Sequence, residues 1–395
     1  MPVAIAERLS RVKPSPTVAL TGRVAKLKAE GRDIIGLGVG EPDFDTPVHI
    51  AKAGIAAIES GFTRYTAVEG IPELKDAIIA KFKRDNGINY TRPQILVSTG
   101  AKQTIYNLLM AVINPGDEVI IPAPYWVSYP DMALLAEGNP VTPFAGPEQG
   151  YKITAAQLEA VITPKSRVFM LNSPSNPTGA AYTRAELEAF GVVLRKHPQI
   201  IVATDDMYEH IYWAPEPFCS FLTACPDLYD RTVTINGVSK SYAMTGWRIG
   251  YCGGPVEVIN AMSTIQSQST SNPVSISQKA AAAAIAGDQA CVAEANRHFK
   301  VRHDFFNAGL NKLPGFRVLP AAGTFYAFCD VTGAMRALGL ADDNAFAEFL
   351  LEKAGVAGVP GSGFGAPGHI RFSFAVSMQT LEQALERIGK ALRGA

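Results

Sequence analysis

The chain has 395 residues, 47% hydrophobic and 18% charged, which is an ordinary globular composition with material for a large core and two or three structural units. Its 36 Lys and Arg balance 36 Asp and Glu, which excludes a net basic field for nucleic acid or an anionic membrane, and no apolar run reaches the length of a membrane span. Five scattered cysteines without a C-x-x-C pair argue against a disulfide framework, no metal site is expected, and the lack of a secretory signal predicts a cytoplasmic protein.

Residues 1–46 are predicted to form an N-terminal arm and the first part of a small domain. The first 20 residues contain Pro14 and Pro16 and are expected to be irregular, with a short helix over 20–30. A strand then enters the glycine-rich loop that ends at Gly40, and a helix is expected from about Val48. The loop glycines are spaced G-x-G-x-G, which is not the dinucleotide fingerprint, so a nicotinamide site is disfavoured.

Residues 47–289 are predicted to form a large domain in which helices and strands alternate. Several strands are apolar throughout, which is expected when helices cover both faces of a mostly parallel sheet. In such sheets ligands bind at the carboxyl ends of the strands. The predicted strands are 95–98, 118–122, 168–171, 200–204 and 232–235, and the predicted helices are 72–86, 102–112, 126–137 and 184–196.

Residues 290–395 are predicted to form a linking helix and a small α+β domain. An alanine-rich helix over 276–286 precedes a charged helix over 290–313, which is expected to join the two domains. Further strands are predicted at 324–330, 356–359 and 370–374, with helices at 344–353 and 381–392.

Lys240 is the first candidate for chemistry. It follows the strand 232–235, lies between two serines, and is eight residues from Arg248. A lysine amine attacks carbonyl groups only where burial or neighbouring cations lower its pKa. From local sequence alone, an exposed loop lysine is the commoner interpretation.

Other unusual segments also follow predicted strands. Gly100-Ala-Lys-Gln-Thr104 opens a helix and is either a phosphate cradle, to which Arg248 could add a guanidinium, or an ordinary turn. In Asn172-Ser-Pro-Ser-Asn-Pro-Thr-Gly179, two X-Pro steps are expected to hold an extended loop that orients Asn176; the alternative is a plain turn. Asp205-Asp-Met-Tyr208 could be a helix N-cap, and Tyr125-Trp126 could be core. Together these side chains suit an aldehyde cofactor with a ring nitrogen and a phosphate.

These segments, with Gly40-Glu-Pro-Asp-Phe44 and the residues from Ser239 to Gly250, resemble fold type I pyridoxal-phosphate aminotransferases. The resemblance covers essentially the whole chain and is closest to the bacterial and plastid aspartate/prephenate branch. It implies an α/β fold with a mostly parallel seven-stranded sheet between helices, a smaller α+β domain, pyridoxal 5'-phosphate as cofactor, and a homodimer whose active sites are shared between subunits.

The resemblance also implies roles for individual residues. Lys240 forms a Schiff base and moves the substrate proton, Asp205 keeps the pyridinium nitrogen protonated, and Tyr208 donates to the phenolic oxygen. Cofactor binding is assigned to Gly100, Ala101, Lys102, Trp126, Asn176, Asp205, Tyr208, Ser239, Lys240, Arg248 and, from the neighbouring subunit, Tyr65. Substrate binding is assigned to Gly40, Trp126, Asn176, Lys102, Lys13, Thr17 and Arg371, which grips the α-carboxylate.

At one place that concerns substrate choice, the sequence differs from a related branch of the family. The stretch 266–277 contains no arginine, although the better-known cytosolic and mitochondrial branch uses one there to bind the side-chain carboxylate of aspartate. In the branch that this chain resembles, the corresponding cation is Lys102. Lys102 therefore has two proposed roles, as a phosphate neighbour and as a specificity residue.

The predicted function is reversible transamination between an amino acid, aspartate or glutamate first, and a 2-oxo acid, in two ping-pong half-reactions. Prephenate or an aromatic oxo acid is a possible acceptor. A carbon–sulfur lyase or another eliminating enzyme on the same scaffold is the alternative, because fold does not fix reaction. A cofactor-binding transcription regulator is disfavoured because there is no room for a DNA-binding module before Leu20.

Overall fold

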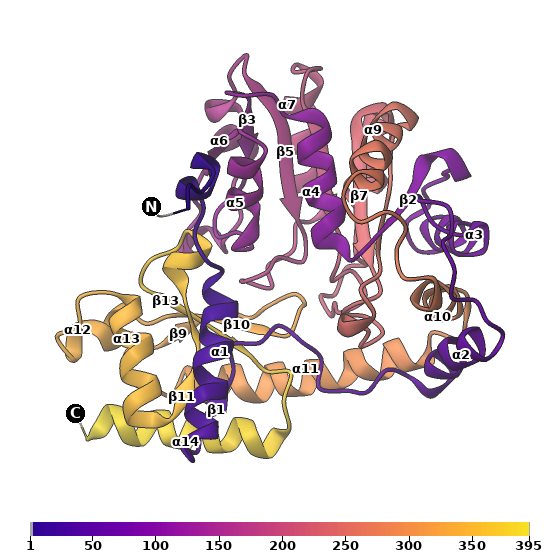
Figure 1. The fold of residues 1–395 in the computed structure, drawn as a ribbon. Coiled ribbons are helices and arrows are strands. Elements are labelled where there is room, and N and C mark those ends of the chain that lie inside the picture. The colour runs from indigo at the N-terminus through magenta and orange to yellow at the C-terminus, as the bar shows by residue number, and fades with distance from the viewer. Residues whose placement is uncertain (1–2, 395) are drawn as a thin grey trace.

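The structure is a computed structural model that describes residues 3–394, and a seven-stranded sheet lies at its centre (Figure 1). The strand order is β2-β8-β7-β6-β5-β3-β4. β8 is antiparallel to both of its neighbours, whereas the pairs from β7 to β4 are parallel. The expected mostly parallel sheet is confirmed. Its strands are β2 (Ile95–Ser98), β3 (Glu118–Ile120), β4 (Asn139–Val141), β5 (Ser166–Asn172), β6 (Ile201–Asp205), β7 (Thr232–Gly237) and β8 (Gly250–Gly253).

Helices cover both faces of this sheet, as the apolar strands predict. Alternate residues of a strand point to opposite faces. In β5, Val168 and Met170 join the hydrophobic cluster that includes α4, α5 and α9, whereas Phe169 and Leu171 join the cluster that includes α6, α7 and α8. The helices around the sheet are α2 (Val48–Glu59), α3 (Pro72–Lys81), α4 (Ala101–Val112), α5 (Ser128–Leu135), α6 (Ala155–Val161), α7 (Arg184–Arg195), α8 (Phe221–Ala224), α9 (Val256–Ser267) and α10 (Ser275–Ala286).

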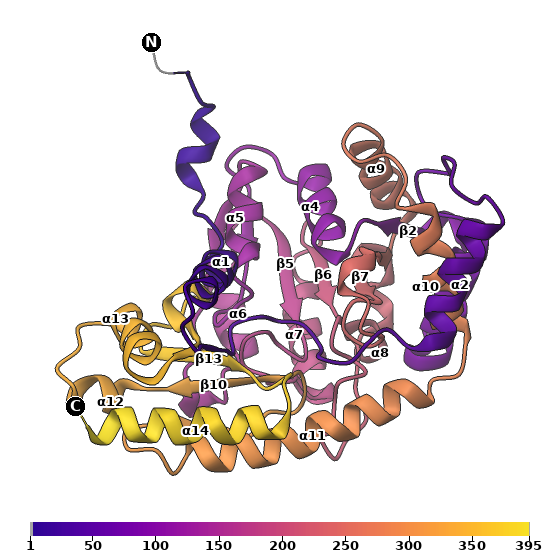
Figure 2. The same ribbon diagram turned by 60° about the horizontal axis from the view of Figure 1, so that its bottom comes forward.

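A second, four-stranded antiparallel sheet has the order β12-β13-β10-β9, and β1 pairs with β11 beside it. The long helix α11 runs from α10 to this sheet, and the segment before α1 projects away from it (Figure 2). The elements of this part are α1 (Pro16–Ala29), β1 (Ile35–Gly36), α11 (Ala290–Leu310), β9 (Arg317–Val318), β10 (Tyr326–Asp330), α12 (Thr332–Ala337), α13 (Asp343–Phe349), β11 (Val356–Ala357), β12 (Val359–Pro360), β13 (His369–Ser373) and α14 (Met378–Arg393).

Several predicted boundaries were wrong. The helix predicted over 20–30 begins at Pro16, because proline suits the first helical turn. The helix predicted over 72–86 has the predicted bounds, but after Lys81 it becomes a π-helical turn, Phe82–Asn86, which is followed by Gly87 with a left-handed φ of 68°. The predicted strand 356–359 is two short strands in two different sheets.

Seven elements were not predicted from the sequence: β4, α6, α8, β8, α9, β9 and α12. β8 begins and ends with glycine, so it lacks the β-branched pattern on which a strand prediction depends. β4 has only three residues and contains Pro140. Within residues 3–394, no helix is long and apolar enough to cross a membrane.

Candidate active site

A cavity of about 260 Å³ lies where the large sheet meets the small one. Most of the residues predicted to be functional line it: Thr17, Gly40, Ala101, Lys102, Trp126, Asn176, Asp205, Tyr208, Ser239, Lys240, Arg248 and Arg371. The topology explains this meeting. β5, β6 and β7 are parallel, with Asn172 level with Asp205, so the segments that follow them leave the sheet at one edge.

The Lys240 side chain is half-buried and faces the cavity. Its Nζ donates a hydrogen bond to the Gly40 carbonyl oxygen at 2.6 Å. Burial, with Arg248 and Arg371 nearby, lowers the pKa of Lys240 to about 8, although Glu41 and Asp205 oppose the shift. About a tenth of the amine is then uncharged at pH 7, far more than for an ordinary lysine, and this fraction is able to act as a nucleophile or base. The interpretation of Lys240 as an exposed loop lysine is wrong.

Asp205 ends β6 as a buried carboxyl group. Tyr129 donates its hydroxyl to Oδ2 at 2.5 Å, and the backbone N–H of Met207 donates to Oδ1 at 3.2 Å. Burial nevertheless raises the pKa of Asp205 to about 6. No helix begins in the residues directly after Asp205, so the N-cap interpretation is wrong. A carboxylate that is costly to ionise in this site would be stabilised by a cation bound beside it.

The raised pKa of Asp205 predicts a pH-dependent stability. Its pKa is 3.8 when unfolded and about 6 when folded, so the folded state retains its proton longer as pH rises. Between about pH 4 and pH 6 the cofactor-free protein should therefore lose stability that Asp205→Asn does not lose. By pH 7 this loss should lower the free energy of unfolding of the wild type, relative to that of the variant, by roughly 3 kcal/mol.

Urea unfolding of the cofactor-free proteins from pH 4.5 to pH 8 measures this difference. Burial also raises the pKa of Asp206, to about 7, but Asp206 is present in both proteins and cancels in the comparison. Parallel pH profiles of wild type and variant would contradict the raised pKa of Asp205.

Arg371 is held rigidly in β13. It is 2% exposed, its Nη1 donates to Asn176 Oδ1 at 2.8 Å, and its Nη2 donates to the Gly38 carbonyl at 2.7 Å. Burial lowers the pKa of Arg371, which shows that its charge is desolvated. A buried, oriented guanidinium is suited to a planar carboxylate.

The loop that carries Asn176 is closed, not extended as predicted. The Gly179 N–H donates to the Ser175 carbonyl at 2.7 Å, and the Ser175 N–H donates to Ala180 at 2.9 Å. Asn172 fixes the loop to its neighbour strand, because its side chain accepts from the Asn176 N–H and donates to the Asp205 carbonyl, both at 2.8 Å. The orientation of Asn176 therefore comes from these hydrogen bonds.

The start of α4 forms the cationic end of the cavity. Gly100 has a φ of 85°, and a Cβ there would lie 2.3 Å from Nη2 of Arg248, so glycine is needed for the guanidinium to approach. Burial, with Arg248, lowers the pKa of Lys102. Two cations beside the first N–H groups of a helix, with Ser239 in the same lining, form a site for an anion such as phosphate.

Three predicted residues are not in the lining of the main cavity, and Gly100, directly before α4, is one of them. Lys13 lines an adjoining cavity that also contacts Lys102 and Arg248. Tyr65 is 91% exposed on the loop after α2. Its predicted role in a neighbouring subunit stays a prediction.

Sequence reasoning missed Tyr129 and Tyr326. Tyr129 lies three residues after Trp126, where α5 begins, and that position at a strand-to-helix turn was a usable signal. The sequence offered no comparable signal for Tyr326, which β10 brings from the small sheet to the cavity.

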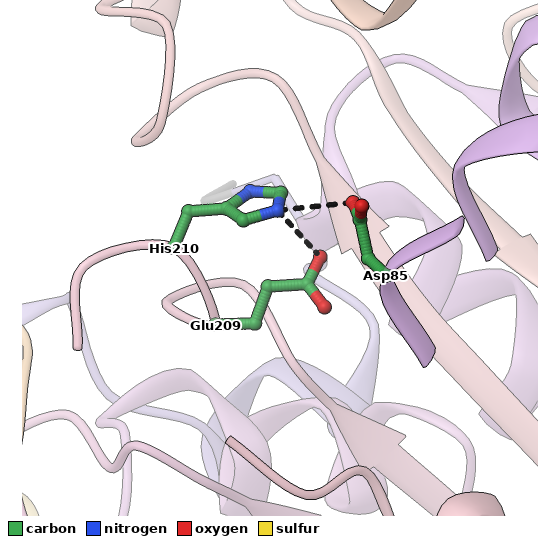
Figure 3. Close-up of side chains that lie close together, drawn as sticks. All are labelled: Asp85, Glu209 and His210. Atoms are coloured by element: carbon green, nitrogen blue, oxygen red, sulfur yellow. Dashed lines mark hydrogen bonds and ion pairs between the residues drawn. The ribbon is translucent and has the colours of Figure 1, made fainter. Parts of the chain in front are cut away.

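Asp85, Glu209 and His210 form a second polar cluster outside the cavity (Figure 3). His210 Nε2 lies 3.1 Å from Asp85 Oδ2 and 3.8 Å from Glu209 Oε1. Lys81 also lies here and forms an ion pair with Glu209. Burial opposes ionisation of Glu209, but Lys81 and His210 lower its pKa overall. The Glu209 carboxylate is thus paired with a buried ammonium, which fixes the loop after Tyr208 to α3.

Comparisons with known proteins give one family along almost the whole chain. The family described as "Aminotransferase class I and II" matches residues 32–388. The aspartate/prephenate aminotransferase of Nitrosomonas europaea is 56% identical over 394 residues, covering 98% of this chain and 99% of that protein. The aspartate/prephenate aminotransferase of Cereibacter sphaeroides is 54% identical over 389 residues, covering 97% of each.

Solved structures agree with the expected fold. An aspartate aminotransferase from Rhizobium meliloti superposes with a TM-score of 0.94 at 46% identity, covering 99% of each chain. The Thermus thermophilus aspartate aminotransferase with maleate has a TM-score of 0.93 at 40% identity, covering 98% of this chain and all of that one. The family match spans both sides of the cavity, from Gly40 to Arg371.

Proposed function

This chain belongs to the class I and II aminotransferase family, and we propose that it transfers an amino group between aspartate or glutamate and a 2-oxo acid, with prephenate among the acceptors. The observation that carries this proposal is the meeting of an amine, a carboxylate and a guanidinium around one cavity: Lys240, Asp205 and Arg371. Its relatives named aspartate/prephenate aminotransferases support the choice of substrates.

The cofactor that fits this site is pyridoxal 5'-phosphate. The cationic end formed by Arg248, Ser239 and the start of α4 would hold the phosphate, and the buried Asp205 carboxylate would hold a protonated ring nitrogen. The Lys240 amine, with its lowered pKa, would meet the aldehyde. When bound, this cofactor supplies an aldehyde that captures amines and a ring that accepts electrons.

The protein's own side chains would do the remaining work. Arg371 binds the α-carboxylate and so presents the α-carbon to Lys240, whose uncharged amine takes the α-proton and returns it. With the cofactor bound, Asp205 would stay ionised and hold a protonated ring nitrogen, and Tyr208 would donate a hydrogen bond to the phenolic oxygen. Trp126 would help to exclude water.

Lys102 is proposed to bind the side-chain carboxylate of dicarboxylic substrates. It lines the same cavity as Arg371, and its Nζ lies 4.9 Å from the centre of the Trp126 ring. We expect Lys102→Ala to lower kcat/KM for aspartate and glutamate about tenfold or more, because a pairing cation is lost. The loss for phenylalanine should be much smaller.

Steady-state kinetics with the three amino donors measure this difference. Lys165→Ala is the matched control, since Lys165 is an exposed cation and lines neither cavity. Equal losses for both classes of donor in Lys102→Ala would assign Lys102 to the phosphate instead.

The alternative is an eliminating enzyme, such as a carbon–sulfur lyase, because the same scaffold supports several reactions. A panel of amino donors and oxo acceptors, including 2-oxoglutarate and prephenate, tests the proposal on the purified protein. A transaminase needs an acceptor to form more than one equivalent of oxo acid per site. Continued formation of oxo acid without an acceptor would support elimination.

We also propose a homodimer in which Tyr65 reaches the partner's phosphate site. Exposed apolar side chains lie on α2, which packs against α10, and directly before α10: Val48, Ile55, Ile58 and Val274. Sedimentation analysis with parallel assays should find activity only in the dimer, and Tyr65→Ala should weaken cofactor retention. A fully active monomer would contradict both statements.

A further inference from the structure

Tyr326 is the first residue of β10 and is only 1% exposed. It contacts three groups to which a function is proposed: the Tyr208 hydroxyl, the Arg371 guanidinium and the Gly40 backbone. These groups come from three separate segments of the chain. No other side chain described above joins all three.

The Tyr326 hydroxyl forms a hydrogen bond with the Tyr208 hydroxyl, with 3.0 Å between the oxygens. Each phenol has one proton to donate. If Tyr208 donates its proton to the phenolic oxygen of the cofactor, Tyr326 must be the donor in the bond between the two tyrosines. Donation to the Tyr208 oxygen stabilises negative charge there and makes Tyr208 a stronger donor.

The Tyr326 ring packs against Arg371, the arginine proposed to bind the substrate. The Arg371 Cζ atom lies 4.3 Å from the ring centre, and the Phe364 ring lies 4.8 Å from the same atom. Arg371 Nε has no hydrogen-bond partner among residues 3–394. The rings therefore supply part of the stabilisation that water would give this buried cation, and they hold its plane.

The same hydroxyl determines what residue 40 can be. A Cβ at Gly40 would lie 2.2 Å from the Tyr326 hydroxyl oxygen, so any residue other than glycine would collide with it. The Gly40 carbonyl accepts the hydrogen bond from Lys240. Tyr326 thus also occupies the space beside the backbone that contacts the reactive amine.

We propose that Tyr326 is a positioning residue with two separable parts: its hydroxyl strengthens Tyr208 as a donor to the cofactor, and its ring holds Arg371 for the substrate carboxylate. This inference rests on the proposed function. It predicts that removing the hydroxyl and removing the ring have different consequences.

Two variants of the cofactor-loaded enzyme separate these parts. Tyr326→Phe keeps the ring, so the affinity for maleate, a dicarboxylate that does not react, should stay within about twofold of wild type. In the same variant, the pKa of the bound cofactor read from its visible absorption should rise by about half a unit to one unit, because the phenolic oxygen loses stabilisation. Tyr326→Leu should in addition weaken maleate binding about tenfold.

Two controls make the test specific. In a Tyr208→Phe background, Tyr326→Phe should cause no further shift of the absorption pKa, because the hydrogen bond is already lost. Tyr151→Phe removes another buried hydroxyl, which has no partner among residues 3–394 and whose ring packs on Phe328 of β10, and it should change neither readout. If Tyr326→Leu does not fold, the nearly isosteric Tyr326→Phe still decides the role of the hydroxyl.

The outcomes also separate this inference from the proposed function. A wild-type protein without pH-dependent visible absorption would overturn the proposed function and this inference together. In a second outcome, the wild-type protein shows this absorption and transaminates, while Tyr326→Phe has the same absorption pKa as wild type. That result would overturn only the role of the hydroxyl. Unchanged maleate affinity in a folded Tyr326→Leu variant would overturn the role of the ring.

Discussion

Replacing Lys240 with alanine should lower the kcat of transamination by about four orders of magnitude. The Lys240 side chain is half-buried in the cavity, its pKa is lowered to about 8, and its Nζ lies 2.6 Å from the Gly40 carbonyl oxygen. Alanine removes the proposed base for the α-proton, and among residues 3–394 no lysine other than Lys102 and Lys240 lines the cavity. Multiple-turnover assays with aspartate and 2-oxoglutarate measure the loss.

Lys240→Arg is the matched control for charge. It keeps a cation near Asp205, but a guanidinium stays protonated and cannot act as a base near neutral pH. Both variants should therefore be inactive, while urea unfolding shows that they remain folded. Normal multiple turnover in Lys240→Ala would contradict the central role of this residue.

Replacing Arg371 with leucine should lower kcat/KM on the order of a thousandfold for every amino acid donor. The guanidinium is buried and held by Asn176 and the Gly38 carbonyl, so a leucine removes the proposed partner of the α-carboxylate and leaves two buried acceptors unpaired. The loss should be similar for aspartate, glutamate and phenylalanine because all three share the α-carboxylate.

Arg371→Lys tests the geometry of this contact. It keeps the charge but cannot make two parallel hydrogen bonds, so its kcat/KM should lie between those of wild type and Arg371→Leu. Comparison with Lys102→Ala separates the two carboxylates of the substrate. A loss in Arg371→Leu that is confined to dicarboxylic donors would show that Arg371 binds the side-chain carboxylate.

Much of the sheet could be predicted because its strands are short apolar runs separated by amphipathic helices. β5 and β6 are buried on both faces, and their nearly continuous apolar sequences indicate this burial. Their ends could be predicted too, since Asn172 and Asp205 are polar residues directly after apolar runs. β8 could not be predicted, because a glycine-rich antiparallel strand takes its conformation from β2 and β7 on either side.

For the candidate site, too, one part could be predicted from the sequence and another part could not. The sequence by itself determined which chemical groups are present and that Gly100, Asn176, Asp205 and Lys240 gather at one edge, because parallel strands with helical connections place their carboxyl ends together. The family resemblance added the roles of Arg371 and Lys102.

Only the tertiary structure decided the contacts between distant segments. Tyr129 meets Asp205 across 76 residues, Tyr326 meets Tyr208 across 118, and Arg371 meets Gly38 across 333. Local sequence does not specify these pairs, because they depend on tertiary packing: α5 lies against the end of β6, β10 against the loop after β6, and β13 against the segment after β1. The burial that lowers the pKa of Lys240 has the same origin, so its reactivity belongs to the fold and not to the segment around it.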